Sequence, residues 1–268
     1  SDPGVEDVHQ ARVASRRLRS DLKTLRAVLD PVWNDHMRGD LRWLGNLLGE
    51  VRDIDVLRQE FGSSGDADDV GDGLRQLDAI LSAQRRSGVV ALREALESQR
   101  YLRLLDRLDA AAVSPPLFVN APRHGRAVRP GHRAQKALPS VVAVPWRSLR
   151  KRVRKAGKTP SDAQLHRIRI GAKQLRYASE LASPVVGRRA RRTARRAEAL
   201  QTVLGDHHDA VLAEAWLRRE STGLPQPGVL EAGRLIEAQR RRQADLRRAW
   251  RGRWRALAKK KDRRWLKA

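Results

Sequence analysis

Apolar residues recur at three- and four-residue steps along most of the chain, and runs of β-branched or aromatic residues are scarce. This spacing gathers apolar side chains on one side of an α-helix and is not typical of strands. The sequence therefore predicts an all-α fold. Helices are expected near residues 5–29, 36–49, 53–61, 72–97, 99–111, 145–156, 160–182, 184–204, 206–219 and 228–262.

A stretch rich in proline and glycine, residues 113–140, interrupts the helical pattern. Because these residue types favour turns over helix interiors, we expect a linker or a long crossover loop there. The predicted domains are a first helical bundle over residues 1–112 and a second over residues 141–268. Each is expected to contain roughly four helices.

The chain contains an internal repeat. The segment VHQARVASRRLRSDLKTL at 8–25 aligns with LHRIRIGAKQLRYASEL at 165–181, so that His9 matches His166, 157 residues later. LGEVRDIDVL at 48–57 aligns with LGDHHDAVLA at 204–213, 156 residues later, and AQRR at 83–86 recurs at 238–241. Three matches in the same order and at nearly one offset indicate two similar helical units.

On a helical projection, basic residues of the first repeat segment fall within an arc of about 100°. This first stripe consists of His9, Arg12, Arg16, Arg19, Lys23 and Arg26, and the second stripe of His166, Arg169, Lys173 and Arg176. Like charges four residues apart repel, so a solvated face usually interleaves acids. The first stripe has none, and the second meets only Glu180. A solvent-facing surface without a ligand is the alternative, but cations roughly 5–6 Å apart match a polyanion.

A further basic face is expected after the linker, within residues 146–158. Its members are Arg147, Arg150 and Arg154, with Lys158 on the same side. The arginines of residues 188–196 are denser but point around much of their helix, so part of that segment is expected to be ordinary surface.

The chain of 268 residues carries a formal net charge of +25, with 56 basic and 31 acidic residues. The charge is uneven, because residues 1–112 hold 17 basic and 20 acidic side chains whereas residues 141–268 hold 34 and 11. A pole this positive repels itself in the compact state, so a polyanionic partner is the natural inference. A genome that favours arginine codons is the competing explanation.

The composition and the lengths of the apolar runs also exclude several kinds of site and segment. The chain has no cysteine, which excludes disulfides, thiolate metal ligands and cysteine nucleophiles. No run approaches 18 apolar residues, and residues 1–30 hold no apolar signal-peptide core. We therefore expect no membrane partner and a cytoplasmic location.

Two acidic segments could suggest a metal site, namely Asp53 with Asp55, and residues 206–209. On a helix, Asp53 and Asp55 point about 200° apart, so they cannot easily share an ion. Asp53 and Asp209 match by the repeat near a helix start, and helix capping or pairing with arginine explains them better. His208 lies at the repeat position of Arg52, which favours an anion contact over a metal-ligand role. No phosphate-binding loop or serine-hydrolase motif is present. We expect no catalytic residue, no metal and no cofactor.

Seven tryptophans stand out against two phenylalanines and two tyrosines. Most are expected to pack between helices. Trp250, Trp254 and Trp265 lie among basic residues and are the candidates for stacking on nucleic-acid bases. Residues 259–268, KKKDRRWLKA, are expected to be a frayed basic tail.

The paired segments around His9 and His166, followed by LGEVRDIDVL and LGDHHD, resemble the CHAD (conserved histidine α-helical domain) family over nearly the whole chain. The resemblance implies two pseudo-symmetric four-helix bundles around a central basic channel. It also implies non-catalytic binding of inorganic polyphosphate and association with polyphosphate granules. By position, the resemblance carries this role to the whole second stripe, to Arg42 and Arg52, and to four residues of the first stripe, namely His9, Arg12, Arg16 and Arg19. Glu198 matches Arg42 by the repeat offset, which argues against equal roles for the two halves.

Two other functions stay open at this point. The same basic surface could bind RNA or DNA without sequence preference. An enzyme acting on polyphosphate or nucleotides would need an acidic metal cluster or a base beside a stripe, and neither stripe has one.

Overall fold

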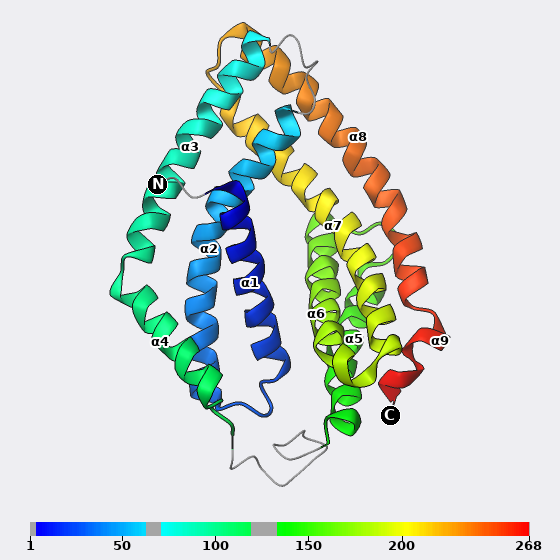
Figure 1. Cartoon of the computed structure of the whole chain (residues 1–268). Helices are drawn as coiled ribbons and strands as arrows, with labels where there is room; N and C mark the ends of the chain where they lie inside the picture. Colours follow the sequence, from blue (N-terminus) through cyan, green and yellow to red (C-terminus); the bar gives the residue numbers. More distant parts are fainter. Residues whose placement is uncertain (1–3, 63–70, 119–132, 268) are drawn as a thin grey trace. The chain divides into compact units, whose positions relative to one another are not determined.

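The computed structural model describes residues 4–62, 71–118 and 133–267 and confirms the all-α prediction (Figure 1). Within these residues, the only β-type pairing is one isolated bridge between Leu29 and Leu117. The helices are α1 (Val5–Thr24), α2 (Pro31–Gly62), α3 (Asp72–Leu96), α4 (Gln99–Val113), α5 (Ala134–Ala156), α6 (Asp162–Val186), α7 (Arg188–Glu220), α8 (Gln226–Leu257) and α9 (Lys260–Arg263), followed by a short 3₁₀ turn (Arg264–Lys267).

The chain packs into two compact units, each built from separate segments. The first unit comprises Ser1–Arg19, Asp35–Pro115 and Ala210–Arg241, and the second comprises Ser20–Asn34, Pro116–Asp209 and Arg242–Ala268. Residues 210–241, from the predicted second half, therefore pack with the first unit.

The first unit is held together partly by an apolar cluster where α2, α3, α7 and α8 meet. The Phe61 and Trp216 rings lie 5.7 Å apart at its centre. The Trp216 indole N–H donates to Gln84 Oε1 at 3.0 Å, which satisfies its polar edge. At the edge of this cluster, α3 and α8 approach so closely that a Cβ on Gly73 would lie 2.3 Å from the Pro227 carbonyl oxygen.

The second unit has a continuous core of its own. Side chains of α5, α6 and α7 are joined there by the C-terminal end of α8 and the 3₁₀ turn. Leu149, Ile168 and Leu175 are fully buried in this core. The Trp146 and Trp254 rings stack beside it, 5.6 Å apart and 16° from parallel.

Two pairs of predicted helices are single helices in the structure. Residues 36–49 and 53–61 belong to α2, and residues 184–204 and 206–219 lie mostly in α7. Gly49 and Gly205, near the expected breaks, do not end either helix. Glycine lowers helix stability only modestly, and each of these two lies against an arginine of another helix.

The predicted helix 5–29 is too long at its C-terminal end, because α1 ends at Thr24. The chain then turns so that the Phe118 N–H can donate to the Val28 carbonyl and the Asp30 N–H to the Pro116 carbonyl. Arg26 therefore lies in this turn and not on α1. The prediction that Arg26 belongs to the helical first stripe is wrong.

The helix after the predicted linker begins earlier than expected. The middle of the linker, residues 119–132, lies outside the described residues, but α5 already starts at Ala134 and runs through Pro139 and Pro145. Each proline removes one backbone hydrogen bond. Burial of Pro139, Val142 and Trp146 offsets that loss.

The C-terminal segment is packed, which makes the frayed-tail prediction wrong for its described residues. Trp265 and Leu266 are buried in the core of the second unit. The Asp262 side chain is 3% exposed and accepts from Arg196 and from Arg192, the latter at 3.2 Å. Trp250 is also buried and the Trp265 indole donates to Thr193 Oγ1 at 3.1 Å. These two tryptophans are thus core residues and not platforms for bases.

Within the described ranges, no helix is long and apolar enough to span a lipid bilayer.

Candidate anion-binding faces

The first candidate site lies where α1 packs beside α2 in the first unit (Figure 1). At 100° per residue, six residues fall on the side of α2 that carries the contacts to α1. They are Arg38, Arg42, Gly45, Gly49, Arg52 and Asp53. We call this side of α2, together with His9, Arg12, Arg16 and Arg19 of α1, the α1–α2 face. Lys23 continues the same stripe one turn further along α1.

Arg12 is fixed in place by α2. Its Nη1 donates to Asp53 Oδ1 at 2.7 Å, and its guanidinium lies over Gly49, where a Cβ would be 3.7 Å from Nη2. Its side chain is 20% exposed, whereas that of Asp53 is 57% exposed. The pairing of Asp53 with arginine confirms the sequence interpretation of this acid. It also means that Arg12 already has one carboxylate partner of its own.

Arg19 lies near two other arginines, Arg42 and Arg38. Partial burial lowers the pKa of its guanidinium, and the charges of Arg42 and Arg38 lower it further. Among the described residues, no carboxylate is hydrogen-bonded to Arg19 or Arg42, and Arg38 pairs only with the exposed Asp35 at 3.3 Å. Three guanidinium groups held together in this way repel one another, and an anion bound among them would relieve that repulsion.

The second candidate site is formed by α6 and α7 in the second unit. It reproduces the first at one key contact, because a Cβ on Gly205 would lie 3.6 Å from Arg169 Nε. Arg169 and Gly205 match Arg12 and Gly49 by the repeat offsets. The internal repeat therefore extends from sequence to a shared arginine-on-glycine contact. We call the side of α7 bearing Glu198, Gly205, His208 and Asp209, together with the second stripe of α6, the α6–α7 face.

His166, which opens the second stripe, packs against a second imidazole. Its ring centroid lies 4.3 Å from that of His208, with the two planes at 49°. Burial lowers the pKa of His166, and the neighbouring charges of Arg169 and Lys173 lower it further. Its Nδ1 is buried without a hydrogen-bond partner in the described structure. Burial and the two neighbouring cations thus favour the neutral form of His166, and negative charge bound nearby would oppose that effect.

Arg176, at the end of the second stripe, is held by two acids. Its Nε donates to Glu180 at 2.7 Å, and its Nη2 lies 2.9 Å from Glu198. Burial acts to lower the pKa of Arg176, but the Glu180 hydrogen bond and the charges of Glu180 and Glu198 outweigh it and raise that pKa. Arg19, the repeat equivalent of Arg176, has the opposite environment.

The predicted basic face of α5 is exposed. Arg147, Arg150 and Arg154 all lie on the surface of the second unit. The buried side of the same helix carries Leu149, and Arg152 beside it donates to the Arg167 carbonyl at 2.8 Å.

Two of the residues weighed as metal ligands, Asp55 and His207, lie beside charged partners. Asp55 is buried and accepts from Arg85 Nε at 2.8 Å. His207 is buried, and its Nε2 lies 3.3 Å from Asp162, which also accepts from Arg247. Burial lowers the pKa of His207, the Arg247 charge lowers it further, and Asp162 opposes both. No cluster of three or more potential ligands is found among residues 4–62, 71–118 and 133–267.

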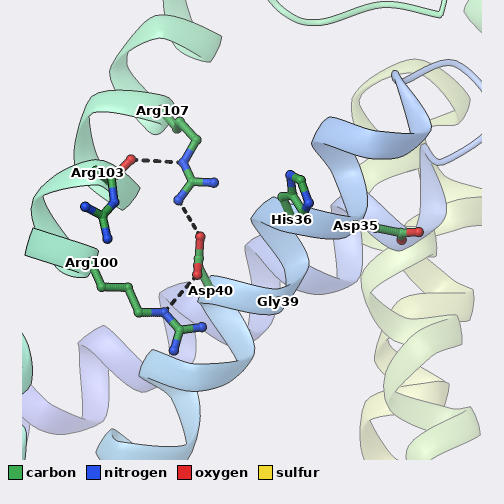
Figure 2. Close-up of a pocket in the computed structure, with 7 residues that line it drawn as sticks. All are labelled: Asp35, His36, Gly39, Asp40, Arg100, Arg103 and Arg107. Atoms are coloured by element: carbon green, nitrogen blue, oxygen red, sulfur yellow. Dashed lines mark hydrogen bonds and ion pairs between the residues drawn. The ribbon is translucent and has the colours of Figure 1, made fainter.

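A charged pocket of about 600 Å³, which was not predicted from the sequence, lies between α2 and α4 in the first unit. Figure 2 shows Asp40 of α2 reaching toward the arginines of α4, while Asp35 points away from them. Asp40 accepts from Arg100 at 3.0 Å and from Arg107 at 2.5 Å, and its side chain is only 12% exposed. Arg100 also lies 4.4 Å above the Trp43 ring. These bonds tie α4 to α2 and explain the cluster as a structural link.

The described residues form an all-α protein of two compact units, with an arginine-on-glycine contact beside each basic stripe. The CHAD domain family model matches residues 1–218, and the chain belongs to that family.

Among curated proteins, the chain is similar to an uncharacterised protein of Mycobacterium tuberculosis (strain CDC 1551 / Oshkosh), with 31% identity over 229 residues. A protein of strain ATCC 25618 / H37Rv is 30% identical over 229 residues. Each match covers 80% of this chain but only 40% of the relative, so the chain spans less than half the length of either.

Two solved structures share the fold. The CHAD domain from the plant Ricinus communis is 32% identical, with a TM-score of 0.72, and the match covers 94% of this chain and 82% of that one. PptA from Streptomyces chartreusis is 21% identical, also with a TM-score of 0.72, and the match covers 94% of this chain and 90% of that one.

Proposed function

We propose that the chain binds inorganic polyphosphate through its basic helical faces and does not chemically transform it. The observation that carries this proposal is the environment of Arg19, whose guanidinium is partly buried beside Arg38 and Arg42. Grouping three cations is unfavourable in the free protein and becomes favourable when phosphate oxygens lie among them. A linear polymer with one charge per phosphate offers such oxygens at every step along a stripe.

Further support comes from how the basic residues are built into the fold. Arg12 and Arg169 are both laid against a glycine of the neighbouring helix. This contact limits the conformational entropy that each side chain would lose on binding a ligand. Binding is accordingly expected to combine charge-assisted hydrogen bonds with counterion release and to weaken steeply as salt is added. A chain that binds polyphosphate in this way is expected at polyphosphate granules.

The alternative is non-specific binding of RNA or DNA, which would use the same charge and show a similar salt dependence. The packing of Trp250 and Trp265 disfavours it, since buried rings cannot stack on bases. Direct competition separates the two ligands. A fluorescent single-stranded RNA is bound to the chain and displaced with long-chain polyphosphate or with unlabelled RNA. The concentration of each competitor is expressed as the concentration of its phosphate groups. Polyphosphate is expected to displace the probe at the lower concentration, and the reverse order would refute the proposal.

A further inference from the structure

The two basic faces differ in charge at positions that match by the repeat. The first repeat has a cation at each of four positions where the second has none. The pairs are Lys23 and Glu180, Arg38 and Ala194, Arg42 and Glu198, and Arg52 and His208. Two of these exchanges reverse the sign of the charge. Because the α1–α2 and α6–α7 pairs share the arginine-on-glycine contact, the exchanges change charge on a common scaffold.

Both reversed positions act on the same guanidinium. Glu180 and Glu198 are bonded to Arg176 at 2.7 Å and 2.9 Å, through different guanidinium nitrogens. The Arg176 side chain is only 25% exposed, so the two carboxylates cover much of what a ligand could reach. In the first repeat, the equivalent Arg19 has Arg42 nearby in place of Glu198.

An incoming phosphate would therefore meet two different surfaces. At Arg19 it gains attraction from three guanidinium groups. At Arg176 the phosphate must displace the two carboxylates and then lie beside their negative charges. Repulsion by these charges lowers the affinity for phosphate.

We propose, on the basis of the proposed function, that Glu180 and Glu198 are internal competitors of the anionic ligand. They exclude phosphate from Arg176 and make the α1–α2 face the stronger of the two binding faces. Arg176 then serves to join α6 to α7, and the ligand contacts of the second stripe are confined to its N-terminal end, at His166, Arg169 and Lys173.

Matched neutral variants test this proposal through the affinity for long-chain polyphosphate at fixed salt. Loss of a charge-assisted contact predicts that Arg19→Gln weakens binding by about tenfold or more. Arg176→Gln is expected to change the affinity by less than about twofold. Circular dichroism checks that both variants fold. If Arg19→Gln unfolds, Arg42→Gln replaces it, since that side chain is exposed.

Removal of the competitors gives the complementary test, because a merely structural role does not predict tighter binding. Glu198→Gln is expected to tighten binding by about threefold, and the double variant Glu180→Lys, Glu198→Arg by about tenfold or more with a steeper salt dependence. Glu237→Gln on α8 is the control. Glu237 is 54% exposed and is paired with Arg241 at 3.0 Å, whereas Glu198 is 45% exposed and lies 2.9 Å from Arg176. Glu237→Gln changes the net charge by the same amount as Glu198→Gln.

Equal losses for Arg19→Gln and Arg176→Gln, or no gain from the Glu198 variants beyond the Glu237 control, would overturn this inference while leaving polyphosphate binding intact. A wild-type chain that does not bind polyphosphate would instead refute the proposed function itself.

Discussion

The glycine under Arg12 offers a quantitative test of how the first stripe is positioned. A Cβ on Gly49 would lie 3.7 Å from Arg12 Nη2, an ordinary van der Waals contact, so alanine fits without displacing the arginine. A leucine side chain extends beyond that contact and must push the guanidinium away from α2. Gly39, on the same helix, has nothing within 4 Å of its Cβ position and lines the pocket toward α4, so it is the matched control.

Replacing a glycine inside a helix by alanine stabilises it by about 0.5–1 kcal/mol. For a chain of this size, each kcal/mol raises the melting temperature by roughly 2–4 °C. Gly49→Ala and Gly39→Ala are therefore expected to melt a few degrees above the wild type by similar amounts, with unchanged binding of polyphosphate.

Leucine separates the two positions. Gly39→Leu is expected to behave like its alanine counterpart. Gly49→Leu loses the Arg12–Asp53 pair, which costs less than about 1 kcal/mol because Asp53 is exposed. Its affinity for polyphosphate is expected to fall by about tenfold if Arg12 contacts phosphate from its present position. Thermal melts and fluorescence titrations measure both effects. Equal affinities for Gly49→Leu and Gly39→Leu would refute the assigned role of Arg12.

Four other outcomes are expected. Saturating polyphosphate raises the melting temperature, because a ligand that binds only the folded state stabilises it; no shift in differential scanning fluorimetry contradicts binding. The double variant Arg16→Glu, Lys173→Glu loses measurable polyphosphate binding but keeps its far-ultraviolet dichroism, and loss of folding instead assigns these residues a structural role. The pKa of His166 in the folded chain lies below its unfolded value, so the stability that His166 contributes is present above pH 6.5 and is lost as the pH falls through the folded pKa. A bound polyanion raises this pKa, so the affinity for polyphosphate is expected to increase as the pH is lowered from 8 to 6. A pH profile of affinity that is identical in His166→Gln contradicts this link. Asp262→Ala removes the carboxylate that Arg192 and Arg196 share and lowers stability by about 1–3 kcal/mol; a denaturation curve that matches the wild type would exclude this loss.

The helical class and the repeat could be predicted from local patterns, since periodicity and spacing are properties of the sequence itself. The offset even paired Glu198 with Arg42, and the structure adds what that exchange does, by bonding Glu198 to Arg176. The expected pairing of Asp53 with an arginine is also confirmed, through Arg12.

Features that depend on distant partners could not be predicted in this way. Helix ends were expected near Gly49 and Gly205, but both glycines lie inside continuous helices, each with an arginine of another helix packed over it. The C-terminal segment is basic in sequence, yet Trp265 packs in a core that includes side chains of the much earlier helices α5 and α6.

The ion pairs of Asp40 illustrate the same limit. Its partners, Arg100 and Arg107, lie 60 and 67 residues away in the sequence and belong to no repeated motif. The three arginines of that pocket do share one face of α4, which is the only local sign of the link.

The most direct test of polyphosphate binding is a crystal structure of the chain with a polyphosphate of defined length. The account predicts phosphate groups within hydrogen-bond distance of Arg12, Arg16 and Arg19 on the first stripe, and of Arg169 and Lys173 on the second. Phosphates found only on other basic surfaces, with both stripes retaining their contacts to the protein alone, would contradict it.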